Sequence, residues 1–221
     1  MTSAQTAKTT IYYTPYVGAL IPIYNGTAWT LAQMSSDLSN ITTNSATGNA
    51  GPAAVTTNSN YDLFVWSNGG TLTLTRGPAW TSDTARGTGA GTTQIAMQNG
   101  IWPNAVAITN GPSANQGTYV GTVRSDGSSQ LNWTATPSAA AGGAEAKLHV
   151  FNAYNRVMFT GLSLDNTGSW TYATATWRSL DNSTANRISY IDGLAELTIN
   201  ASLQGGVNQT AGGLYHFGIN R

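Results

Sequence analysis

The stretch DLFVWSNGGTLTLTR, from Asp62 to Arg76, constrains the fold more than any other part of the chain. Its first five residues are mostly aromatic or strand-forming, and the last six alternate between polar and apolar side chains. Between them, Asn68, Gly69 and Gly70 supply the residue types that tolerate the positive φ angles of a tight turn. The stretch therefore predicts a β-hairpin.

The same signals recur along most of the chain. A second hairpin is predicted from Gly117 to Thr134, with strands at 117–124 and 130–134 joined through the turn-forming pair Asp126-Gly127. Further strands are predicted at 11–16, 92–97, 101–109, 147–152, 157–164, 170–178, 187–191 and 194–203. Turns rich in Gly, Asn, Asp and Ser separate these segments, so strand connections are expected to be short.

Helical signals are scarce. The one candidate is Leu31 to Ile41, where Leu31, Met34, Leu38 and Ile41 recur at roughly helical spacing. Many strands with turns between them favour an all-β fold, and we expect a jelly-roll-like antiparallel β-sandwich with at most one short helix. Residues 1–41 would form an N-terminal arm with the first strands and a possible attachment segment, 42–60 a loop or linker, and 61–221 the main sandwich.

Charge is sparse. Only 8% of the 221 residues are charged, against roughly 25% in an ordinary soluble domain. Nine basic and nine acidic side chains cancel, which argues against nucleic acid as a partner. The chain has no cysteine, hence no disulfides, and no apolar run approaches the ~20 residues that span a bilayer. We expect no membrane insertion and synthesis without a secretion signal.

No pattern of catalytic or metal-binding residues stands out. Most acidic residues lie in turn contexts such as Asp165-Asn166 and Asp181-Asn182, where their side chains bond the local backbone. A calcium site at either turn is an open alternative, although the alternating acidic ligands of a calcium loop are absent. His149 and His216 lack zinc-ligand spacing, and a structural role is expected. The sequence predicts no catalytic residue, no metal and no cofactor, and a protein that is not an enzyme.

A glycine-rich segment, GPAWTSDTARGTGAGTTQI at 77–95, raises the question of phosphate binding. The dinucleotide fingerprint requires G-x-G-x-x-G before a helix, and a P-loop requires Lys-Ser/Thr after its last glycine. Neither is present, because the glycines run G-T-G-A-G and a predicted strand follows. The segment is interpreted as a loop between strands.

Aromatic residues are the remaining candidates for binding, because flat rings with polar edges suit sugars and protein partners. Trp80 and Trp102 flank the glycine-rich segment, and with Asp83, Arg86 and Asn99 they are candidates for a glycan patch. Tyr154 and Arg156, in FNAYNRV, form a similar candidate contact cluster. The alternative is that the tryptophans pack inside the sandwich or at a subunit seam.

Several blocks of the chain resemble a known module. IYYTPYVGALIPIYNGTAW, the 62–95 region, GTYVGTVRSDG, FNAYNRV and SWTYATATWRSLDNSTANRISYIDGLAE are similar to a module of tailed bacteriophages, prophages and phage-like particles. Its members are described as tail-fibre-like or as virion proteins of uncharacterised role. The similarity runs from Ile11 to about Glu196 and brings no assigned catalytic or ligand residues.

The resemblance implies a structural protein on the surface of a virion, made in the cytoplasm of the bacterial host. Its partners would be other virion proteins of the tail or capsid, and by analogy it would form a homotrimer. We expect a fibre or adhesin-like module involved in host attachment. Two alternatives stay open: a capsid decoration protein, such as a head fibre or cement protein, and a lectin or depolymerase domain that binds host surface polysaccharide.

Overall fold

The computed structural model describes residues 3–44, 48, 50–135, 144–156, 171, 174, 176–194 and 200. This part of the chain is mostly β-structure in several antiparallel sheets, and it contains no α-helix. Two short 3₁₀-helices, η1 (Leu180–Asn182) and η2 (Thr184–Asn186), lie near its end. The expectation of an all-β fold is confirmed at this level. No helix in the described part is long and apolar enough to cross a membrane.

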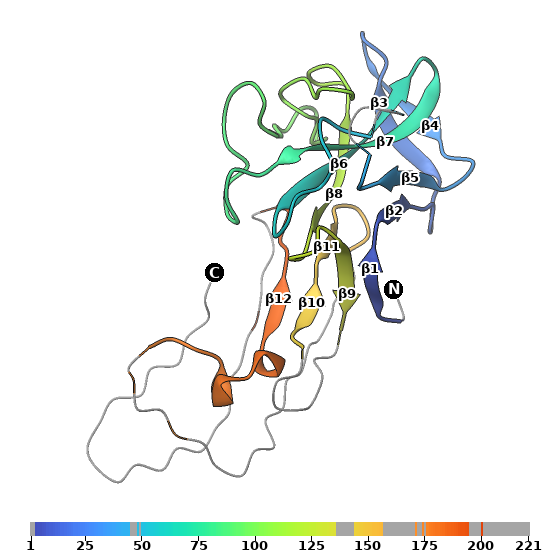
Figure 1. Ribbon diagram of the computed structural model, residues 1–221. Helices are drawn as coiled ribbons and strands as arrows, with labels where there is room; N and C mark the ends of the chain where they lie inside the picture. Colours follow the sequence, from blue (N-terminus) through green and yellow to red (C-terminus); the bar gives the residue numbers. More distant parts are fainter. Residues whose placement is uncertain are drawn as a thin grey trace.

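A four-stranded sheet in the order β11-β8-β6-β7, which we call the central sheet, lies in the upper half of the view in Figure 1. The predicted hairpin at 62–76 is confirmed as β6 (Asn60–Asn68) and β7 (Thr71–Ala79), with Asn68 opposite Thr71 across the turn. β8 (Thr118–Arg124) pairs antiparallel with the other edge of β6, and β11 (Val150–Asn152) completes the sheet.

Apolar clusters cover both faces of this sheet. Leu63 and Val65 of β6 point into one cluster, whereas Phe64 points into the other. β8 contains a bulge opposite these residues. Leu63 pairs with Gly121 and Phe64 pairs with Tyr119, so Val120 of β8 has no partner of its own on β6. The extra residue keeps the alternation in step with the two clusters, and the run of apolar residues in β6 is explained by burial on both sides.

Two small hairpin-like pairs from the first 41 residues cover the first face. β2 (Thr10–Tyr13) pairs with β5 (Leu38–Ile41), and β3 (Leu20–Tyr24) pairs with β4 (Trp29–Gln33). Ile21, Ile23 and Met34 join the same buried cluster as Leu63 and Val65. The described N-terminal segment and the central sheet thus share one core, and the three-part division of the chain stays a prediction.

The helix predicted from Leu31 to Ile41 is wrong. This segment contains most of β4, a bend, and β5. Trp29 and Thr30 favour a strand, the Asn25-Gly26 turn directs β4 back along β3, and Ser35 to Asp37 interrupts any helix. The spacing of the apolar residues at 31, 34, 38 and 41 is compatible with a helix. The segment forms two strands instead, because β4 pairs with β3 and β5 pairs with β2.

A second sheet has the order β1-β9-β10-β12 and lies below the central sheet in Figure 1. Its strands are β1 (Gln5–Lys8), β9 (Leu131–Thr134), β10 (Ala146–Leu148) and β12 (Ile188–Tyr190). β10 and β12 run parallel, and the other pairs are antiparallel. The predicted strand at 147–152 is divided at His149, where the chain passes from the second sheet into the first.

The predicted hairpin at 117–134 is correct in its strands and its turn but wrong in their pairing. The turn closes, since the backbone N–H of Asp126 donates to the carbonyl of Gln130 at 2.9 Å. Beyond one isolated bridge, Ser125 to Leu131, the strands diverge into different sheets. Both edges of β8 are already occupied, by β6 and β11, so β9 pairs elsewhere.

The strands predicted at 92–97 and 101–109 are also wrong, because these segments form only isolated bridges such as Ile95 to Asn104. Pro103 lacks a backbone N–H, and the Asn99-Gly100 turn breaks the run, so a continuous ladder does not form. The strand predicted at 157–164 lies outside the described residues, as does most of 194–203. Of the strand predicted at 170–178 the structure describes residues 171, 174 and 176–178, and none of these is in a strand. The strand predicted at 187–191 is confirmed as β12.

Most of the 42–60 loop is described, and a buried arginine holds it against β7. Arg76 is 1% exposed, and its guanidinium donates to Asn40 Oδ1 at 2.5 Å and to the carbonyls of Ile41 at 2.9 Å and Ala53 at 2.7 Å. It also bonds the carbonyl of Asn44. The backbone oxygens of the loop thus replace the water that the cation loses on burial.

Candidate functional site

The residues with the densest polar contacts surround Trp80, immediately after β7. The backbone N–H of Trp80 donates to the carbonyl of Asn60 at 2.9 Å, which fixes the end of β7 beside the start of β6. The guanidinium of Arg86 lies 4.3 Å from the centre of the Trp80 ring, within the range of a cation–π contact. Half-buried Arg86 is thereby held over the face of the ring.

The carboxylate that faces Arg86 is Asp62, whose side chain is fully buried. Arg86 Nε lies 2.7 Å from Asp62 Oδ2, and its Nη2 lies 3.1 Å from Oδ1, which is a two-point contact. Thr122 donates to Oδ1 at 2.7 Å, and Thr93 donates to Oδ2 at 3.3 Å. The buried charge is therefore both paired and hydrogen-bonded, as burial requires.

The network continues through the second apolar cluster. Tyr119 Oη lies 2.6 Å from Thr122 Oγ1, and since Thr122 donates to Asp62, the phenol donates to Thr122. Burial, and then the charge of Asp62, raise the pKa of Tyr119, so the phenol keeps its proton. Arg86 also donates to the carbonyl of Gly193, which connects this network to a segment 107 residues away in sequence.

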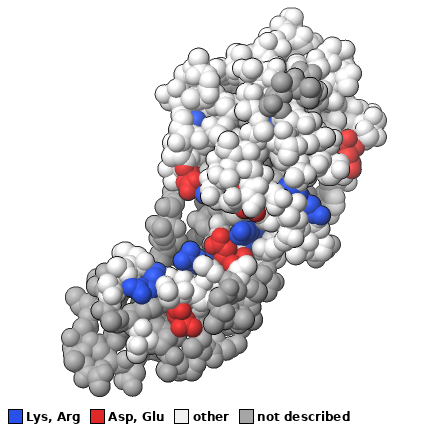
Figure 2. All heavy atoms as spheres, in the orientation of Figure 1, with Lys and Arg blue, Asp and Glu red and all other residues white. Residues whose placement is uncertain are grey.

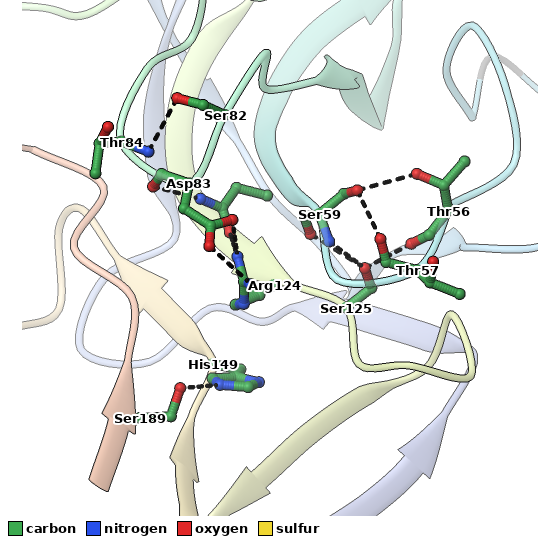
Figure 3. A network of polar contacts seen from close by, with 11 residues as sticks. Thr56, Thr57, Ser59, Ser82, Asp83, Thr84, Arg124, Ser125, His149 and Ser189 are labelled. Carbon is green, nitrogen blue, oxygen red and sulfur yellow. Dashed lines mark hydrogen bonds and ion pairs between the residues drawn. The ribbon is translucent and has the colours of Figure 1, made fainter. Parts of the chain in front are cut away.

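A second arginine–carboxylate pair lies at the same end of the sheet (Figure 3). Arg124, at the end of β8, contacts Asp83 at 2.7 and 3.2 Å and donates to Asn60 Oδ1 at 2.9 Å. Asn60 donates in turn to the backbone carbonyl of Asp83 at 3.0 Å. The Asp83 side chain is 70% exposed, so this pair contributes less to stability than the buried Asp62 pair.

Hydroxyl groups lock the neighbouring loop, as Figure 3 also shows. The buried Ser125 hydroxyl accepts the backbone N–H of Ser59 at 2.9 Å and lies 2.6 Å from the carbonyl of Thr56, to which it donates. Thr56 Oγ1 lies 2.9 Å from the Tyr61 hydroxyl. These hydroxyl contacts hold residues 56–61 against the end of β8.

His149 completes the polar contacts drawn in Figure 3, where its ring meets Ser189. Its Nε2 lies 2.9 Å from Ser189 Oγ, and no hydrogen bond to its buried Nδ1 is present among the described residues. Burial, helped by the positive charges of Arg124 and Lys147, lowers the pKa of His149 to about 4. The imidazole is neutral at pH 7.

Three of the seven predicted contact residues lie together. Trp80 and Arg86 are stacked, and Asp83 is joined to Trp80 through Asn60. The polar side-chain atoms of Arg86 and Asp83 are used in internal bonds, whereas the buried Trp80 Nε1 has no hydrogen-bond partner among the described residues. Trp102 is half-buried against the second cluster, and its carbonyl accepts the N–H of Tyr119 at 2.8 Å.

The other three predicted residues lie apart from this group. Asn99 is exposed in a tight turn with a φ of 51°. Tyr154 and Arg156 are exposed in the turn after β11, where the Tyr154 N–H donates to Asn152 Oδ1 at 2.9 Å and Arg156 Nε donates to the Ala153 carbonyl at 3.2 Å. The Arg156 guanidinium lies 5.8 Å from the centre of the Phe151 ring.

Sequence reasoning missed the partners that organise the site: Asn60, Asp62, Thr122, Arg124 and Gly193. One signal was available for Asp62. Period-2 alternation places it on the same face of β6 as Phe64, and a carboxylate in a strand buried on both faces requires a cationic partner. Which arginine provides the charge depends on the tertiary fold.

Within the part of the chain that the structure describes, no three His, Cys, Asp or Glu residues gather as a metal site requires. Asp181 lies in η1 with a φ of 50°, and Asp165 lies outside the described residues, so the calcium alternative stays a prediction. Comparisons of the chain with protein-family models, with curated proteins and with solved structures found no match.

Proposed function

We propose that this chain is a non-enzymatic structural module displayed on the surface of a tailed-bacteriophage particle, as a fibre or adhesin-like component that takes part in host attachment. One observation supports the structural role most. The charged groups around Trp80 connect strands and loops to one another, as Arg86 does with Asp62 and Gly193. A rigid module with few free charges suits an exposed particle protein.

The virion part of the proposal rests on the resemblance of the sequence blocks between Ile11 and Glu196 to phage modules. A jelly-roll-like sandwich, which the sequence predicts and which goes further than the observed antiparallel sheets, would suit this role. Partners would then be other virion proteins of the tail or the capsid. The capsid decoration alternative uses the same fold at a different place on the particle.

The experiment is immunogold labelling of particles purified from an induced lysate, with an antibody raised against the full chain. We expect gold on the particles and the protein in their mass spectrum. Label confined to tails supports the fibre, and label confined to heads supports the decoration protein. Particles that lack the protein would contradict both.

A lectin role is the second candidate, and one feature favours it: the exposed carboxylate of Asp83 lies in the same loop as the Trp80–Arg86 stack. Sugar sites commonly combine an aromatic ring with charged hydrogen-bonding groups. The test is binding of the full chain to host surface polysaccharide, comparing wild type with Asp83→Asn and, as a matched exposed control, Asp37→Asn. Equal binding by all three, or none, contradicts a glycan site at Asp83.

A further inference from the structure

The outward side of the β3–β4 hairpin carries a row of apolar residues, of which two are exposed and three are half-buried. Alternation sends Ile21 and Ile23, each 3% exposed, into the core. The opposite side presents Leu20 at 63% and Leu31 at 67% exposure, and we call its residues the hairpin face: Leu20, Pro22, Tyr24, Trp29 and Leu31. The rings of Tyr24 and Trp29 contact each other at 5.5 Å. An apolar ladder of this kind is rare on the solvent side of a strand pair.

β4 also has a free edge. The bonds from Met34 N–H to the Ala19 carbonyl and from Asn25 N–H to the Ala28 carbonyl set the hydrogen-bonding phase of the pair. In this phase the N–H and C=O groups of Trp29, Leu31 and Gln33 point away from β3. Among the described residues, β4 pairs with β3 alone. The edge therefore presents a row of unpaired backbone groups.

Charge does not protect this edge. Natural edge strands are commonly blocked by lysine or other charged side chains. Between residues 9 and 61 the chain has a single charged residue, Asp37, which lies beyond the end of β4. In Figure 2 the upper part of the molecule, which includes this hairpin in the shared orientation, is almost free of coloured groups, and these gather lower down.

We propose that a second copy of this chain pairs with the free edge of β4, antiparallel and across a twofold axis at Leu31. Each Leu31 would then lie opposite its counterpart, and each Trp29 opposite Gln33 of the other copy. A twofold interface places identical patches together, so a charged edge would repel itself, and a neutral one does not. The absence of Lys and Arg from residues 9–61 disfavours an anionic membrane as the occupant.

The pairing has a physical gain beyond the backbone bonds. The two hairpins would merge into one sheet with the order β3-β4-β4-β3, and the exposed Leu31 side chains would meet at the seam. Apolar cross-strand pairs of this kind stabilise antiparallel sheets. This self-association goes beyond the proposed function and does not depend on it. A twofold dimer also differs from the homotrimer that the phage resemblance implies.

Cysteine cross-linking of the full chain tests the register directly, because the chain has no cysteine of its own. Residues opposite each other in a hydrogen-bonded antiparallel pair have Cα atoms about 5.5 Å apart, within disulfide range. Under mild oxidation we expect Leu31→Cys to form a covalent dimer. Leu20→Cys, equally exposed on the same face but on β3, is the matched control and should stay monomeric on a non-reducing gel.

A second measurement uses Leu31→Lys and Leu20→Lys in sedimentation equilibrium. We expect wild type to dimerise with rising concentration, Leu31→Lys to weaken the dimer by about tenfold or more, and Leu20→Lys to change it less. A wild type that stays monomeric overturns the proposal. A trimer that does not cross-link through Leu31→Cys also overturns it, as do equal losses of dimer in both lysine variants. Pairing of the β4 edge with another virion protein alone would overturn it as well.

Discussion

Two buried charges at the centre of the molecule are satisfied in different ways. Arg76 is surrounded by the oxygens of Asn40, Ile41 and Ala53, and burial lowers its pKa. Asp62 instead faces the guanidinium of Arg86 and two hydroxyl groups. In a chain with so few charges, each buried one fixes segments that are distant in sequence. Removing one partner leaves the others unsatisfied inside the protein.

The first prediction concerns Asp62→Asn. The amide keeps the shape of the side chain but removes the negative charge opposite Arg86, so the guanidinium loses its ion partner. Breaking one side of a buried pair of this type costs about 3 kcal/mol of unfolding free energy. Urea denaturation followed by tryptophan fluorescence measures the loss. The control is Asp37→Asn, which changes an exposed carboxylate and should shift stability by only a few tenths of a kcal/mol. Similar losses in both variants would contradict the assigned role of Asp62.

At the scale of elements, β8 and β11 approach too closely for a side chain at Gly121. A Cβ added there would meet the carbonyl oxygen and carbon of Phe151, which are backbone atoms and cannot move aside without separating the strands. We expect Gly121→Ala to lower the free energy of unfolding by about 1–3 kcal/mol. Gly18→Ala is the matched control, since nothing lies within 4 Å of its added Cβ. Thermal denaturation of both variants checks the difference, and equal melting temperatures would rule out the steric account.

A prediction on pH belongs to His149, at the step between β10 and β11. Its pKa is about 4 in the folded chain, below the ordinary value of 6.5, so folding favours the neutral ring. Its contribution is complete above pH 6.5 and is lost as the pH falls toward 4, by up to about 3 kcal/mol. His149→Gln does not titrate, so the stability difference between wild type and variant should change between pH 7 and pH 4.5. A difference that is constant across this range would show that His149 is not buried in its neutral form.

Elements that depend on neighbouring residues could be predicted from the sequence, whereas elements that depend on partners distant in the sequence could not. The hairpin at 62–76 was predictable because turn and strands are adjacent, and alternation specifies its faces. The strand at 31–33 was not, because its apolar spacing fits a helix until the partner β3 is known. Of the site, Trp80 and Arg86 were found from local composition. Asp62, Thr122 and Gly193 were missed, because only the folded chain brings them to Arg86.

At the scale of the whole molecule, the central sheet separates two apolar clusters and belongs to both. Leu63 and Val65 of β6 face one cluster, and the neighbouring Phe64 faces the other. The second sheet contributes Leu131 to the first cluster, so it too is joined to this core. The apolar cluster on one face cannot unfold while the other stays folded, because the same paired strands support both clusters. The described part of the chain should therefore unfold as one cooperative unit.

Substitutions on opposite sides of the sheet test this cooperativity. Ile23→Ala lies in the first cluster and Leu194→Ala in the second, and each side chain is at most 5% exposed. Either change should cost about 2–4 kcal/mol, as cavity-forming substitutions do. In both variants, far-ultraviolet circular dichroism and tryptophan fluorescence should follow one shared transition at a lower urea midpoint. The exposed Leu20→Ala should leave that midpoint nearly unchanged. If Leu194→Ala instead produced two separate transitions in the circular dichroism, with an early step that Ile23→Ala lacks, the two sides of the sheet would be separate units, and the shared strands would not couple them.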